Sequence, residues 1–84
     1  MTKLQIAKIE REMTLLLQSS ERIRIDQKYD TPSQIRRKID RIAKKEAELQ
    51  GMHTILSALG YYAEYHFGEG ENGETLSCYT INKL

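Results

Sequence analysis

The stretch Asp30-Thr31-Pro32-Ser33-Gln34 separates two long amphipathic segments and decides the fold of this chain. The residue before a proline is sterically pushed out of the helical region, whereas proline itself suits the first position of a helix. Thr31 and Gln34 stand three residues apart, as in a capping box, where each side chain bonds a free amide at the helix start. We therefore predict that one helix ends before this stretch and that a second begins at Pro32.

Both flanking segments place mainly apolar residues at the alternating three- and four-residue steps of helix–helix packing. The first segment is predicted to be helical over residues 2–28. The second is predicted over residues 32–59, with Gly60 suited to a left-handed cap. The two packing seams are Ile6, Ile9, Met13, Leu16, Ser20, Ile23 and Gln27, and Ile35, Ile39, Ile42, Glu46, Leu49, His53 and Leu56. Two helices of about 27 residues each, joined by a tight turn, should form an antiparallel hairpin.

The residues after Gly60 favour a β-hairpin over residues 61–82. Segments 61–67 and 75–81 carry strand-forming residues, and Asn72-Gly73 between them is a strong turn signal. An isolated two-stranded hairpin is marginally stable in water, so it should pack on the helices or pair with another strand. The predicted fold is a single domain over residues 1–84, α+β and mainly α, with the helical hairpin followed by the β-hairpin.

Composition narrows the function classes. The chain has 84 residues and a net charge of +1, which argues against a globally basic nucleic-acid binder. There is no apolar run of about 18 residues, so no membrane association is expected. The N-terminus lacks the apolar block of a signal peptide, and the single Cys78 fits a reducing compartment. We therefore expect a cytoplasmic protein.

No pattern of chemistry-bearing residues points to catalysis. His53, His66 and Cys78 do not stand at metal-ligand spacing. We interpret His53 as a structural seam residue rather than a pH-sensitive group, and Cys78 as a small buried residue. The acidic segment 68–74 matches neither a phosphate-binding loop nor a calcium loop. The expectation is a non-enzymatic protein without cofactor or metal.

One charged group of the second predicted helix stands out. Arg37, Arg41 and Lys45 stand four residues apart and are all positive, an arrangement that destabilises a helix slightly, and Lys38 extends them. We call these four residues the basic ridge and expect it to point away from the packing seam. It suggests an anionic partner, either a phosphate backbone or an acidic protein surface. The alternative is a solvated face that keeps the protein soluble.

Tyrosines of the predicted β-hairpin form a second candidate surface. Tyr61, Tyr62, Tyr65 and Tyr79 lie on its two strands, and tyrosine is favoured at interface hot spots. A free strand edge could also receive a strand from a partner. The alternative is that these rings complete a small core.

Some apolar residues project away from the predicted seams. Leu4, Leu15 and Ile25 in the first helix, and Ile55 in the second, need another surface to cover them. A second copy forming a four-helix bundle would do so, and we predict a homo-oligomer on this basis and on the small size of the chain. Isolated surface leucines are also common, so a monomer is the alternative.

The function hypothesis that follows is a small interaction protein that binds a larger protein. The short charged hairpin with a β appendage resembles, in general character only, many small accessory proteins of bacteria and phages. An inhibitor or adaptor of a nucleic-acid-handling complex, such as a phage or mobile-element antidefence inhibitor, is the version we expect. The alternatives are a dimeric, sequence-nonspecific nucleic-acid binder that uses the basic ridge, and a self-assembling coiled-coil protein without an external ligand.

Overall fold

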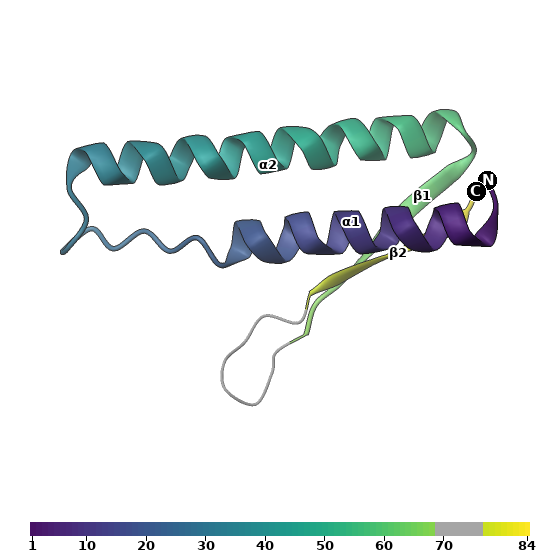
Figure 1. The fold of residues 1–84 in the computed structure, drawn as a ribbon, viewed down its shortest axis with the longest axis horizontal. Coiled ribbons are helices and arrows are strands. Elements are labelled where there is room, and N and C mark those ends of the chain that lie inside the picture. Colours follow the sequence, from purple (N-terminus) through teal and green to yellow (C-terminus); the bar gives the residue numbers. More distant parts are fainter. Residues whose placement is uncertain (69–76) are drawn as a thin grey trace.

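A computed structural model, which describes residues 1–68 and 77–84, shows two packed helices followed by an antiparallel β-hairpin (Figure 1). Helix α1 spans Lys3–Glu21 and helix α2 spans Pro32–Ala58. Strands β1, Tyr61–His66, and β2, Cys78–Lys83, form a two-stranded sheet. The predicted α+β, mainly α, fold is confirmed. The predicted Asn72-Gly73 turn and the start of the second predicted strand lie outside the described residues.

Both helices begin at a capping box, and the sequence predicts the one at the start of α2. The Thr31 hydroxyl accepts the Gln34 amide proton at 3.2 Å, and the Gln34 side chain accepts that of Thr31 at 2.9 Å. Thr2 and Gln5 form the same capping box at the start of α1. At the other end of α2, Gly60 has φ of +85°, a conformation that is strained for any residue with a Cβ. These local signals therefore fix three helix ends.

The predicted end of the first helix at residue 28 is wrong, because α1 ends at Glu21 and residues 22–31 form an irregular connection rather than a tight turn. The Asp26 amide, which would bond backward in a continuous helix, donates instead to the Asp30 carboxylate at 2.9 Å. The Asp26 carboxylate accepts the Lys28 amide proton at 3.0 Å. Aspartate side chains thus satisfy backbone donors of the connection in place of the backward bonds that a continued helix would make.

Strand β2 is attached to α1 by side chains that bond its free edge. The Ile81 amide donates to Glu10 at 2.7 Å and the Tyr79 amide to Thr14 at 3.0 Å, while Gln18 donates to the Ser77 carbonyl at 3.0 Å. The three side chains stand four residues apart on α1, a rise of about 6.0 Å, and the backbone groups they bond stand two residues apart, a rise of about 6.8 Å. Because the two spacings nearly match, successive side chains meet successive outward-facing backbone groups. Helix α1 thus covers this edge of the sheet.

The hydrophobic core lies where both helices and the sheet meet. Its buried members are Met13, Leu49, Leu56 and Ile81. The first three occupy predicted seam positions. Ile39, also a predicted seam residue, is 51% exposed, because this part of α2 lies opposite the irregular connection instead of a helix.

Candidate functional site

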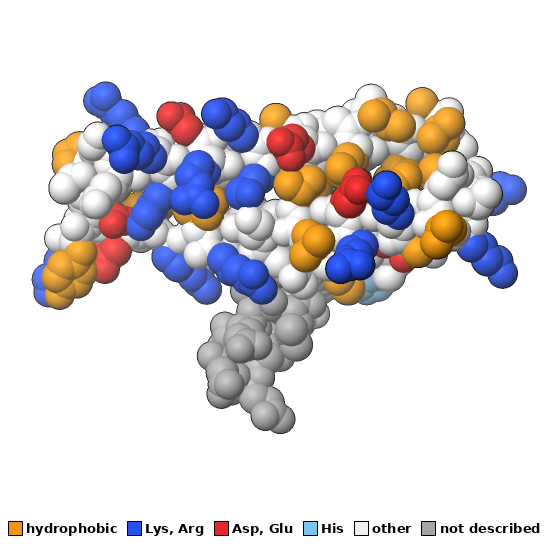
Figure 2. Space-filling view, viewed as in Figure 1, with side chains coloured by type: hydrophobic (Ala, Val, Ile, Leu, Met, Phe, Trp, Pro, Cys, Tyr) orange, Lys and Arg blue, Asp and Glu red, His pale blue; other side chains and the backbone are white. Residues whose placement is uncertain are grey.

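The basic residues gather at the end of the helical hairpin where α1 leads into α2. Figure 2 shows Lys and Arg side chains grouped over this end, and hydrophobic side chains mostly over the other end. An open pocket of about 420 Å³ lies here. It is lined by Ser19, Arg22, Ile23, Arg24, Lys38 and Arg41. The pocket thus combines cations from the connection and α2, and we call it the basic pocket.

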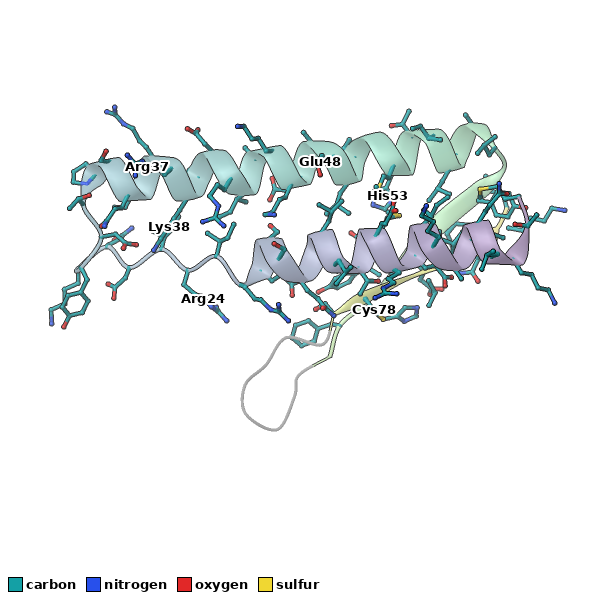
Figure 3. The ribbon with its side chains drawn as sticks, viewed as in Figure 1. Arg24, Arg37, Lys38, Glu48, His53 and Cys78 are labelled. Atoms are coloured by element: carbon teal, nitrogen blue, oxygen red, sulfur yellow. The ribbon has the colours of Figure 1, made fainter. Side chains whose placement is uncertain are left out.

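The basic ridge is not one uniform outward face. Arg37 and Lys38 project in different directions from α2, Arg37 away from α1 and Lys38 toward the connection (Figure 3). Arg41 lines the basic pocket, and Lys45 is half-buried beside α1. The expectation that the ridge points away from the packing seam is therefore wrong for Lys38 and Lys45, which turn toward the first helix and its connection.

Lys38 is held in place by the connection. Its ammonium donates to the Asp30 carboxylate and to the Arg24 carbonyl, both at 2.6 Å. The hydrogen bond from Lys38 lowers the pKa of the Asp30 carboxyl, and the bond from the Asp26 amide lowers it further. Lys38 therefore anchors the wall of the basic pocket, and Arg22, Arg24 and Arg41 are the pocket's other cations.

We expect the Asp30→Asn variant to lose stability at neutral pH but not in acid. Because the pKa of Asp30 is lowered on folding, its contribution is fully present above the ordinary aspartate value of about 3.9 and is lost as pH falls through the lowered folded value. Urea unfolding of wild type and variant at several pH values measures this difference. A difference that is constant from neutral to strongly acidic pH would contradict the assignment.

An apolar groove continues from the basic pocket between the two helices. It is open, has a volume of about 540 Å³ and shares Ser19 and Arg22 with the basic pocket. Its full lining is Glu12, Leu15, Leu16, Ser19, Arg22, Lys45 and Met52. We call the basic pocket and this groove together the hairpin groove. It offers apolar contact at one end and several cations at the other.

The four candidate tyrosines of the hairpin divide between core and surface. Tyr61 and Tyr79 pack against the core, and the Tyr79 ring meets the His53 ring edge-on at 5.3 Å. Tyr62 and Tyr65 are 44% and 47% exposed. Burial raises the pKa of the Tyr79 hydroxyl, and the neighbouring Tyr65 and Glu21 add to the rise. His53 is half-buried with Tyr79 as its aromatic neighbour, and its structural role stays a prediction.

The four predicted oligomer contacts all lie at the surface. Leu4 is 81% exposed, Ile55 62%, Leu15 55% and Ile25 39%. Leu15 lines the hairpin groove, so it belongs to the same surface as the basic pocket. Whether a second copy covers these side chains stays a prediction.

Arg22 and Arg24 are the groove cations that sequence reasoning missed. The sequence alternates Arg22-Ile23-Arg24-Ile25, a pattern that suits extended backbone better than a helix. Treating residues 2–28 as one helix placed these arginines on a helix surface instead of beside Arg41. The alternation was therefore the available signal for this part of the pocket.

Other kinds of site find no support in residues 1–68 and 77–84. These residues contain no cluster of three or more His, Cys, Asp or Glu side chains that could hold a metal ion. None of their helices combines the length and apolar character needed to cross a membrane. Cys78 is a free thiol, half-buried rather than fully buried as expected. The hairpin groove and the exposed hairpin tyrosines remain as candidate interaction surfaces.

Comparisons with protein-family models, with curated proteins and with solved structures found no match to this chain. The functional argument therefore rests on the chain's own residues.

Proposed function

We propose that this chain is a non-enzymatic interaction protein that binds the surface of a larger protein through the hairpin groove. The observation that carries the proposal is the continuity of an apolar groove with a basic pocket, which share Ser19 and Arg22. A protein surface with an acidic part beside an apolar part would match both ends. A phosphate backbone would use the cations but leave Leu15 and Met52 without a partner.

Electrostatics would set the orientation of such a complex more than its strength. Complementary charge steers encounter and fixes register, whereas buried apolar and aromatic anchors supply most of the affinity. The basic pocket would meet carboxylates of the partner, and Leu15, Leu16 and Met52 would cover its apolar side chains. The preformed Lys38–Asp30 contact reduces the ordering that binding requires on this side.

Within this class, an inhibitor or adaptor of a nucleic-acid-handling complex is the narrower form of the proposal. An antidefence inhibitor encoded by a phage or mobile element would be one example. The support for it is the positive charge of α2 and of the connection before it, which would suit a partner whose surface carries acidic side chains or bound phosphate. Identifying the protein that the chain captures, in the experiment below, decides whether the partner belongs to a nucleic-acid-handling complex.

The test uses tagged protein to capture both proteins and nucleic acids from a lysate, followed by affinity measurement with the purified partner. We expect one protein to be captured, and Arg22→Glu, Arg41→Glu and Leu15→Ala each to weaken its binding. A central charge or anchor residue typically contributes about 2 kcal/mol, which corresponds to roughly 30-fold in affinity. Lys83→Glu, an exposed cation on β2 outside the groove, is the matched control and should bind as wild type does.

Two results would overturn the proposal. Equal capture by wild type and all three groove variants would remove the groove from the interface. Capture of nucleic acid alone, with affinity that falls steeply as salt rises, would favour the nucleic-acid-binding alternative.

A further inference from the structure

The outer edge of β1 carries backbone groups that point away from β2. In an antiparallel pair, residues directly opposite each other direct their backbone groups either both inward or both outward. Tyr79 and Ile81 direct theirs outward, because their amides donate to α1. Their partners in the register are Tyr65 and Ala63, whose amides and carbonyls therefore also point outward, on the opposite edge. The inward bond from the Leu84 amide to the Gly60 carbonyl, at 2.9 Å, fits this alternation.

The two edges of the sheet differ in their hydrogen bonding. Side chains of α1 bond the edge of β2, whereas within residues 1–68 and 77–84 no hydrogen bond reaches the outward groups of Ala63 or Tyr65. Folded proteins generally cover or blunt such an edge, because its free donors and acceptors attract another strand. Near this edge Tyr65 is 47% exposed and Phe67 is 67% exposed. The β1 edge is therefore an unsatisfied pairing surface.

We propose that β1 pairs antiparallel with β1 of a second copy, on a two-fold axis at Tyr65, to give a continuous four-stranded sheet. In this register Glu64 lies opposite His66 of the second copy, and His66 opposite its Glu64. A carboxylate then faces an imidazole at both symmetric positions, and opposite or hydrogen-bonding pairs stabilise neighbouring strands. On the other face, Ala63 lies opposite the exposed Phe67 of the second copy and gives it cover.

The pairing of Glu64 with His66 favours this register over the neighbouring ones. It also favours a second copy of the chain as the partner. A two-fold axis at Glu64 would set two glutamates against each other, which is destabilising. An axis at Ala63 would pair Glu64 with Tyr62 and would place no carboxylate opposite an imidazole. Both side chains lie on the same face of the sheet. His66 Nε2 lies 2.8 Å from the Thr80 hydroxyl and 3.9 Å from the Glu64 carboxylate of its own chain, and Glu64 accepts from Asn82 at 3.3 Å. The β1 sequence is therefore complementary to itself at one register.

This interface differs from the helical one expected from the sequence. It uses none of the off-seam residues Leu4, Leu15, Ile25 or Ile55, and it leaves the hairpin groove of each copy open. It is independent of the proposed function, and a dimer of this kind would present two grooves.

The sharpest test is Ala63→Pro, with Ala63→Ser as the matched control. Proline removes the outward amide proton but leaves the bonds between β1 and β2 intact, because Ala63 makes none of them. Sedimentation equilibrium should give twice the 9.8 kDa chain mass for wild type and Ala63→Ser, and the single-chain mass for Ala63→Pro. Circular dichroism verifies that the proline variant is folded.

Exchanging the residues at positions 64 and 66 tests the register without introducing a proline. His66→Glu places two like-charged pairs across the axis and should weaken the dimer about tenfold, and adding Glu64→His should restore it. Three outcomes would overturn the proposal: a wild-type monomer at about 1 mM chain, a dimer that survives Ala63→Pro, or an exchange that does not restore association.

Discussion

Replacing Leu56 with alanine is expected to lower the free energy of unfolding by about 2–5 kcal/mol. Leu56 is 1% exposed and packs with Met13, Leu49 and Ile81, so the truncation removes buried apolar surface and leaves a cavity at the junction of both helices and the sheet. A domain of this size has only a few kcal/mol of net stability in reserve. The variant should therefore be largely or partly unfolded at room temperature.

Ile55→Ala is the matched control, because it removes a side chain of similar size from the neighbouring position. Ile55 is 62% exposed, and the loss should stay within about 0.5 kcal/mol. Urea unfolding followed by circular dichroism measures both variants. Equal losses for Leu56 and Ile55 would contradict this core and would indicate that Ile55 is covered, as the prediction of a helical oligomer requires.

The sequence predicts the parts of this fold that local chemistry decides. The start of α2 is set by the neighbouring residues Thr31, Pro32 and Gln34. The sequence therefore predicts its first residue, Pro32, correctly. The core positions Met13 and Leu56 follow from helical spacing, because the structure packs those parts of the two helices together. Where a signal is contained within one turn of chain, the prediction and the structure agree.

The end of α1 could not be predicted from spacing, because competing interactions decide it. The apolar spacing continues through Ile23, so a longer helix is consistent with the pattern. In the connection that follows, the Asp26 amide bonds to Asp30, a carboxylate that Lys38 also holds from α2, instead of bonding backward as in a helix. Contacts between separate segments thus override the periodic pattern.

The candidate site was predicted only in part for the same reason. Arg41 and Lys45 were singled out, but the pocket exists because the connection brings Arg22 and Arg24 beside them. The apolar side of the groove includes Leu15, which was assigned to a different surface. A helical wheel gives the direction of each side chain but not what a neighbouring segment places next to it.

The second large effect is expected from Glu10→Ala. The Glu10 carboxylate accepts the Ile81 amide proton at 2.7 Å, and Ile81 belongs to the buried core. Removing the acceptor leaves a donor without a partner in a part of the sheet edge that α1 covers, and an unsatisfied buried group costs about 1–3 kcal/mol. We expect a loss in this range, with faster hydrogen exchange at the Ile81 amide.

Glu10→Gln and Glu12→Ala separate this bond from the general effect of removing a charge. Glutamine keeps an acceptor oxygen at the same distance along the side chain, so Glu10→Gln should retain most of the stability and the slow exchange of the Ile81 amide. Glu12 is exposed on the same helix and accepts no hydrogen bond from the described residues of β2, so Glu12→Ala should change the stability by no more than about 0.5 kcal/mol and leave the exchange of the Ile81 amide unchanged. Equal losses in Glu10→Ala and Glu12→Ala would mean that helix charge, not the bond to β2, stabilises this edge. A loss confined to Glu10→Ala would establish that α1 acts as the neighbour of β2, which leaves the edge of β1 as the side of the sheet open to another strand.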